Sequence, residues 1–417
     1  MNKIYKLFKN NIFLNALIFT FLSSAMYVGF INNNDIELIR KFDDEAFDFM
    51  NRLVSTTSYD FNQKVLVFEV DNYFLQKNHL MDEDGLTNQN YGNALPRQYL
   101  IDFITEVDKV NPKLLFIDYD LSLNTQPQKD EELIKLLKKD RNYPIYFTHN
   151  KNSNFIEQNV VNNNVKFVST VLAKNTDGIV RRYESFIGRK NSAGKLQKYY
   201  YAPLIFADVE LSKIKTSYDV TQNRFIYKNR FKDENSIEKS YWNEITFFSF
   251  EKKIVSLKKQ YTKDAIIFLG ENHSDSSDKH AIYNGLEKSG VEILANSLAS
   301  VYYFNPQLEL LPFIPSILIL FISTFITRIL FVSLIKKMVL FFLIAIIINT
   351  FISYIIFTFY NSWFNYNIIA YGAYILYDYK AILNDIKAVL NDAKKRLIAV
   401  LNDAKKQLTD IFSSNNK

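Results

Sequence analysis

Polar side chains stand at the ends of several short apolar runs in this 417-residue sequence. Asp118 and Asp120 end the run KLLFIDYDL, and two strand residues at this spacing point to one face, as a pair that binds a hard cation or a hydroxyl group would. The residues at such ends are Asp71, Asn72, Asp118, Asp120, His149, Asn150, Glu271, Asn272 and His273. If the runs are neighbouring strands, these side chains converge on one rim. The alternative is that each only marks where a strand emerges into water.

Three further charged residues are candidates for ligand contact. Arg181 and Arg182 follow closely after Gly178, and they can either form salt bridges with acids of the same domain or bind an anionic ligand. Asp278 can form a polar pair with His280 in the loop after the last apolar run. For the two arginines both alternatives remain open.

The spacings of common catalytic and cofactor sites are missing from the sequence. The four histidines are scattered and there is no cysteine. We recognise no zinc ligand set, Ser-His-Asp triad, glycine-rich phosphate loop or nucleophile elbow. We therefore predict a protein that is not an enzyme, has no cofactor and no dedicated metal site, and binds no nucleic acid. A weaker alternative is an external hydrolase that uses Asp118, Asp120 and Glu271 with a metal ion.

Strands and helices that would position these residues alternate between residues 32 and 309. Five apolar runs are predicted to be buried strands, at 64–72, 113–121, 143–150, 165–173 and 264–273. Helices with one apolar face are predicted at 97–110 and 129–139, and a hairpin followed by a helix within 183–209. This order predicts an α/β fold with a mixed, mainly parallel sheet and flanking helices. In such sheets ligands bind outside the carboxyl ends of the strands.

Long apolar segments flank this region on both sides. Four are long enough to be predicted as transmembrane helices, although the last is shorter than the others: 12–31, 310–335, 338–360 and 363–377. For the first segment, a cleaved signal peptide is the alternative, because lysines precede it and small residues lie within it.

Basic residues orient the predicted spans. They are concentrated in residues 1–11, between the later spans and in 378–417, whereas 32–309 is slightly acidic in a chain of net charge +6. The positive-inside rule then predicts a multi-pass protein of the cell inner membrane, with both termini cytoplasmic and 32–309 periplasmic. Without cysteine, that domain would fold there without disulfides.

From Asp35 to Phe304 the chain resembles the extracellular CHASE sensor domain of the second type. The similar segments, in the order of the family, are RKFDDEAFDF (40–49), FEVDN (68–72), LPRQYLIDFI (95–104), FIDYDLSL (116–123), DEELIKLL (130–137), TDGIVRRYESF (176–186), AIIFLGENHSDSSDKH (265–280) and SGVEILANSLASVYY (289–303). The resemblance implies an external domain that binds an unknown small ligand and signals across the membrane.

The tail 378–417 departs from the pattern of many relatives, which carry a cyclase or kinase domain at this place. About forty residues are too few for such a core. They contain the repeat LNDAKKRLIAV (390–400) and LNDAKKQLTDI (401–411), whose apolar residues form one stripe on a helix. This cytoplasmic amphipathic helix can form a homodimeric coiled coil, dock on a cytoplasmic or membrane protein, lie on membrane lipid, or remain solvated.

These features favour an integral inner-membrane receptor that passes its signal to a separate cytoplasmic partner. The competing interpretation is a structural or scaffolding subunit of a cell-envelope complex, in which the external domain binds protein. The identity of the external ligand is not encoded in any recognisable motif.

Overall fold

The computed structural model describes most of the region between the predicted spans. The described residues are 37–82, 84–87, 95–119, 121, 127–149, 156, 159–160, 163–190, 196–214, 223–252, 262–283 and 285–304, with 309–310, 314–315, 318–319, 322, 347, 351–352, 354–356 and 362–363. The chain divides into two compact units, and the larger comprises Asp44–Leu310 with Asn361–Trp363.

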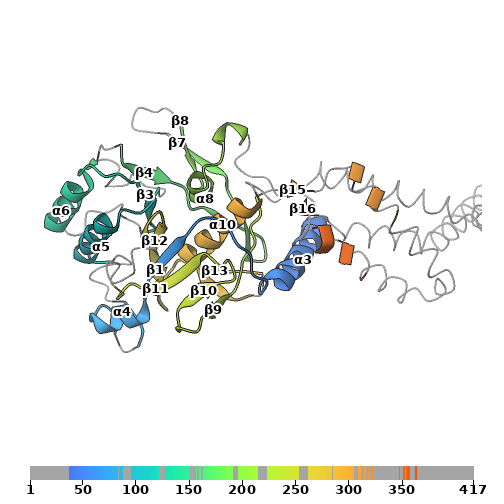
Figure 1. The fold of residues 1–417 in the computed structure, drawn as a ribbon, viewed down its shortest axis with the longest axis horizontal. Coiled ribbons are helices and arrows are strands. Elements are labelled where there is room, and N and C mark those ends of the chain that lie inside the picture. The colour runs from blue at the N-terminus through green and yellow to red at the C-terminus, as the bar shows by residue number, and fades with distance from the viewer. Residues whose placement is uncertain are drawn as a thin grey trace, which may run out of the picture. The chain divides into compact units, whose positions relative to one another are not determined.

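In the described part of the chain, eight strands form one sheet at the centre of the larger unit (Figure 1). Their spatial order is β4-β3-β2-β12-β1-β11-β10-β9. The strands from β4 to β11 run parallel, and β10 and β9 are antiparallel at one edge. Their bounds are β1 Val65–Asp71, β2 Leu114–Ile117, β3 Ile145–Thr148, β4 Val165–Val168, β9 Arg230–Lys232, β10 Glu238–Ser240, β11 Ile245–Ser249 and β12 Ile266–Asn272. The predicted mixed, mainly parallel α/β sheet is confirmed.

Helices α5 (Arg97–Val110) and α6 (Pro127–Leu137) cover one face of the sheet (Figure 1). The predicted apolar face of α5 is buried through Leu100, Phe103, Ile104 and Val107. The Phe103 ring lies edge-on to Phe68 of β1, with ring centroids 5.4 Å apart. Since a fully buried side chain of this kind contributes about 1.5–3 kcal/mol, this layer is a main source of stability.

Helices α8 (Ala202–Phe206) and α10 (Gly290–Phe304) cover the other face. Phe206 of α8 contacts Phe116 and Phe268, which project from β2 and β12 on the opposite side to α5. Gly270 of β12 allows α10 to approach closely, because a Cβ at this position would lie 2.6 Å from Cβ of Val291. The sheet is therefore enclosed between two helical layers.

Helix α10 is buried along most of its length, although it carries several polar residues. Oδ1 of Asn296 accepts a hydrogen bond from the Lys228 backbone N–H at 2.9 Å, and Oγ of Ser300 accepts one from the Ile226 N–H at 3.1 Å. These side chains replace strand partners for the segment around residues 225–229, which is why buried polar groups are tolerated in the helix.

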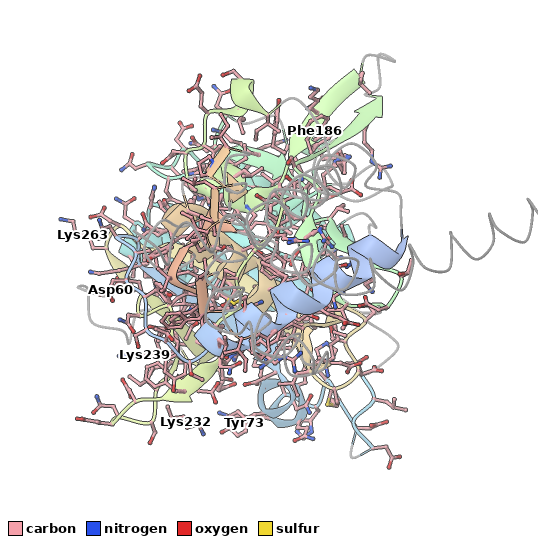
Figure 2. All side chains as sticks on the ribbon, turned by 90° about the vertical axis from the view of Figure 1, so that its right-hand side faces the viewer. Asp60, Tyr73, Phe186, Lys232, Lys239 and Lys263 are labelled. Atoms are coloured by element: carbon pink, nitrogen blue, oxygen red, sulfur yellow. The ribbon has the colours of Figure 1, made fainter. Side chains whose placement is uncertain are left out.

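Several predicted elements are present with changed bounds. The predicted run 165–173 is divided between β4 and β5 (Leu172–Lys174), and β5 pairs with β6 (Val180–Tyr183). The predicted hairpin is formed by β7 (Phe186–Lys190) and β8 (Leu196–Tyr200), and α8 follows it as expected. Strands β9 to β11 were not predicted. Of these three, β9 is the edge strand, and its Lys232 side chain is 68% exposed (Figure 2).

The predicted membrane segments and the tail 378–417 fall almost entirely outside the described residues. Within the described ones, no helix is long and apolar enough to cross a membrane. Leu310 and Trp363, which begin two predicted spans, lie in the short parallel strands β15 (Glu309–Leu310) and β16 (Ser362–Trp363).

Candidate functional site at the carboxyl ends of the strands

The carboxyl ends of β2, β3 and β12 place three polar side chains near one another. Asp118 directly follows β2, and its backbone N–H donates to the carbonyl oxygen of Leu269 in β12 at 2.8 Å. Glu271 lies two residues further along β12, and Thr148 ends β3 on the other side of β2. The neighbouring strands thus bring Asp118 and Glu271 to one rim of the sheet.

The Asp118 carboxyl group is held in a half-buried position. Oγ1 of Thr148 donates a hydrogen bond to Oδ1 of Asp118 at 2.5 Å. Burial, followed by the negative charges of Asp278 and Glu271, raises the pKa of Asp118 from 3.8 to about 8, and the Thr148 hydrogen bond only partly offsets this. Asp118 therefore retains a proton at pH values at which an exposed aspartate would be ionised.

Glu271 and Asp278 each have an imidazole beside the carboxylate. Oγ of Ser276 donates to Oε2 of Glu271 at 3.0 Å, and Nε2 of His273 lies 3.4 Å from the same oxygen. Nε2 of His280 lies 3.1 Å from Oδ1 of Asp278. The predicted Asp278–His280 pair is formed. We call the carboxyl groups of Asp118, Glu271 and Asp278 the acidic rim.

A backbone contact fixes the place of Asp278. The Gly290 N–H, at the start of α10, donates to the Asp278 carbonyl oxygen at 2.9 Å. A Cβ on Gly290 would lie 2.1 Å from Oδ2 of Asp278, so glycine is needed for the Asp278 side chain to pack there. The hairpin of β13 (Lys279–Ala281) and β14 (Glu287–Ser289) joins the two residues.

Tyr119 adds a hydroxyl group next to the acidic rim. The residue is 4% exposed, and its hydroxyl has no hydrogen-bond partner among the described residues. Burial, and then the charges of Glu271, Asp118 and Asp278, raise the pKa of the Tyr119 hydroxyl well above its usual value. The charges of all three carboxylates therefore act on the Tyr119 hydroxyl. Sequence analysis did not identify Tyr119 as a site residue, because a tyrosine directly after a strand is more typical of the core.

The structure shows no preformed metal site in the part of the chain that it describes. There, no three histidine, aspartate or glutamate side chains are arranged to hold one ion. The carboxylates of Glu271 and Asp278 are close enough for their charges to influence Asp118. Asp120, the predicted neighbour of Asp118, lies outside the described residues.

The remaining strand-end candidates have other contacts. Oδ1 of Asp71 accepts a hydrogen bond from the Phe74 N–H at 2.9 Å and so caps α4 (Asn72–Lys77). Asn272 pairs in register with Asp71, and its side chain adjoins the Glu69 carboxylate. The His149 ring stacks on Tyr199 of β8, with centroids 3.7 Å apart and planes 4° apart.

Arg181 and Arg182 project from β6 toward helix α3 (Glu37–Val54). Arg181 donates from Nε and Nη2 to both carboxylate oxygens of Asp48, at 2.7 and 2.6 Å. Arg182 pairs with Asp44, and Nη1 of Arg182 donates to Oδ1 of Asn175 at 3.1 Å. Of the two alternatives for the arginines, the described contacts are those of buried salt bridges. Their partners lie in the segment RKFDDEAFDF, and no local pattern connects it with the arginines.

A second buried charged cluster, which sequence reasoning also missed, joins β1, β9 and α10. Arg230 bridges Glu69 and Glu292, with Nη1 2.8 Å from Oε2 of Glu69. Nearby, the buried Lys228 Nζ donates to the Thr57 carbonyl oxygen at 3.0 Å and lies 3.8 Å from the Tyr59 ring centroid. Burial lowers the pKa of Lys228 to about 6. These groups tie the end of α3 to the sheet.

One comparison with known proteins gives a match. A family model described as CHASE2 domain matches residues 18–335, a range that contains every segment on which the resemblance was based. No curated protein and no solved structure matches the chain.

Proposed function

Because the chain belongs to the CHASE2 domain family, a family of sensory domains, we propose that it is a receptor of the cell inner membrane. In this proposal the domain of residues 32–309 is periplasmic, binds a small ligand at the acidic rim and does not transform it. The four predicted spans anchor the domain, and the tail 378–417 passes the signal to a separate cytoplasmic partner.

The observation that carries the proposal is the acidic rim itself. Carboxylates that are crowded together raise one another's pKa and cost stability. Burial, followed by the charges of Asp278 and Glu271, raises the pKa of Asp118, and no lysine or arginine among the described residues forms an ion pair with it. Strained electrostatics at the carboxyl ends of parallel strands favours a binding function, because ligands of such folds bind at this edge.

An electrostatic influence, a ring stack and an ion pair relate the acidic rim to α3. The charge of Asp118 acts on the hydroxyl of Tyr201, whose ring stacks on Tyr183 with centroids 4.4 Å apart. Tyr183 directly follows Arg182, the partner of Asp44. Helix α3 begins shortly after the predicted span 12–31, so a ligand that displaces these side chains would act on the chain close to the membrane.

A ligand screen tests this proposal on the full-length protein in lipid nanodiscs. Thermal unfolding is followed with a panel of amino acids, sugars, amines, organic acids and metal ions, since a ligand at about 100 times its Kd stabilises by about 2.7 kcal/mol. We expect at least one compound to raise the Tm of the wild type and of Asp102→Asn, an exposed acid on α5, but not of Asp118→Asn. A panel without any stabilising compound would contradict the receptor function.

The partner is tested by affinity purification from native membranes, with the full-length protein and a version that ends after Tyr379. A cytoplasmic signalling protein that is recovered only with the intact tail is the expected result. Recovery of the same envelope proteins by both versions would instead support the structural subunit.

A further inference from the structure

The polar atoms around the acidic rim are mainly hydrogen-bond acceptors. The carboxylates are acceptors when ionised. Nε2 of His273 and of His280 each faces a carboxylate oxygen, so in the neutral ring the proton belongs on Nε2 and Nδ1 is an acceptor. Both Nδ1 atoms are buried and have no hydrogen-bond partner among the described residues. A complementary ligand must therefore supply donors.

The negative charge of the acidic rim also favours a positively charged ligand. In the described part of the chain, no lysine or arginine forms an ion pair with Asp118, Glu271 or Asp278, and the ring nitrogens beside Glu271 and Asp278 belong to histidines. A cation beside a carboxylate favours its ionised form, and N–H groups that bind an ionised carboxylate make hydrogen bonds stronger than neutral ones.

The arrangement distinguishes an organic cation from a metal ion. No set of three ligating side chains for a metal ion exists among the described residues. Donors that are separated along a carbon chain can reach carboxylates that are separated on the rim. The buried hydroxyl of Tyr119 has no hydrogen-bond partner among the described residues and can accept a further N–H.

The acidic rim is accessible to such a molecule. The Asp278 side chain is 40% exposed, and Asp118 is half-buried. Glu271 and Tyr119 lie deeper, at 8% and 4% exposure. A ligand that comes from the solvent would therefore meet Asp278 and Asp118 first.

We propose that the acidic rim binds an organic cation with two or more protonated amines, of the class of diamines and polyamines. This inference depends on the proposed receptor function and narrows its ligand class. On binding, Asp118 releases its proton to the solvent, and the ammonium groups donate hydrogen bonds to the ionised carboxylates.

Isothermal titration calorimetry on the full-length protein in nanodiscs tests the inference with 1,4-diaminobutane and spermidine. The matched neutral probe is 1,4-butanediol, which has the same carbon chain without charge, and Ca²⁺ and Mg²⁺ are competitors. We expect the amines to bind and butanediol not to bind. Asp118→Asn should weaken amine binding by about tenfold or more, the loss typical of a charged hydrogen bond, while Asp102→Asn leaves it unchanged.

Tyr119→Phe is the second variant, because it removes only the hydroxyl and keeps the buried ring. It should weaken amine binding measurably while the Tm of the free protein is maintained. An unchanged amine affinity in both Asp118→Asn and Tyr119→Phe would overturn the inference. Equal losses of affinity in Asp118→Asn and Asp102→Asn would also overturn it, because they would indicate attraction to surface charge alone.

The failure of this inference can be distinguished from the failure of the receptor function. If a neutral or anionic compound, or Ca²⁺, binds in a manner that needs Asp118 while the amines do not bind, the ligand class is wrong and the receptor function stands. If neither the amines nor any compound of the wider panel binds, both fail.

Discussion

Asp44 of α3 pairs with Arg182 of β6, which lies 138 residues later in the chain. One helical turn further along α3, Asp48 holds Arg181 through two hydrogen bonds. Two segments of the family pattern, one acidic and one with an arginine pair, are thus partners in one buried cluster. The cluster joins the helix that follows the predicted first span to the strand that leads to Tyr183.

Removal of the Asp48 carboxylate should destabilise the protein markedly. Asp48→Ala leaves the buried Arg181 guanidinium without its main partner, and breaking a buried pair in this way costs about 3–5 kcal/mol. The control is Asp177→Ala, since Asp177 contacts the same guanidinium but is 45% exposed, and it should cost about 1 kcal/mol or less. Urea unfolding of the full-length protein, followed by tryptophan fluorescence, measures both. Equal losses of stability in Asp48→Ala and Asp177→Ala would show that burial of the Asp48–Arg181 pair does not add to its contribution.

The close approach of α10 to β12 depends on Gly270. Gly270→Ala places a methyl group where the Val291 side chain now lies, and we expect a loss of about 1–3 kcal/mol in the free energy of unfolding. At Gly188 in the β7–β8 hairpin, a Cβ meets only the side chain of Leu196, which is 65% exposed and can move. Gly188→Ala should therefore change stability much less, and a reversed order of the two variants would disprove this packing account.

Lys228 should make stability rise with pH. Its pKa is about 6 in the folded state and 10.5 when exposed, so between these values the unfolded chain binds more protons than the folded one. This group alone then contributes a rise of about 1.4 kcal/mol per pH unit over that window and nothing below it. Lys228→Met should remove the rise, whatever its effect on stability at a single pH.

Unfolding free energies at pH 6.5, 7.5 and 8.5 measure this slope. The control is the same substitution at Lys232, which is exposed on β9 and should leave the slope as it is (Figure 2). If the unfolding free energies of Lys228→Met and the wild type rise equally with pH, Lys228 is protonated in the folded state over this whole pH range. Its surroundings would then offset the cost of burying its charge.

Asp118, in contrast to Lys228, should make the free energy of unfolding fall as pH rises. Its pKa is raised from 3.8 to about 8, so in this window the folded state holds a proton that the unfolded state has lost, and stability falls as pH rises. Asp118→Asn keeps an acceptor for Thr148 and cannot ionise. Its Tm should exceed that of the wild type more at pH 8 than at pH 5. A constant difference between these pH values would contradict the raised pKa of Asp118.

The sequence was informative wherever a structure depends on local pattern. The continuous apolar runs before Asp118 and Glu271 indicated buried parallel strands, and the position of both residues at strand ends made their proximity predictable. The capping role of Asp71 was not predictable in the same way, because an aspartate after a strand can equally face a ligand or begin a helix.

Other features depend on pairings between distant segments. β12 inserts between β1 and β2, and β11 reaches β1 from the other side, although both come after a long excursion of the chain. Asp48 and Arg181 are likewise 133 residues apart. Periodicity specifies which side of an element is buried but not which element covers it, and for this reason the partners of the two arginines remained open.

Hydrogen exchange of the full-length protein in nanodiscs tests the central claim most directly, with and without 1,4-diaminobutane. The account predicts slower exchange in β2, in β12 and the loop after it, together with a change in the amides of α3, and neither effect in Asp118→Asn. Protection at the acidic rim without any change in α3 would contradict the proposed link to the membrane, and an unchanged exchange pattern throughout would contradict the acidic rim as the site for this ligand.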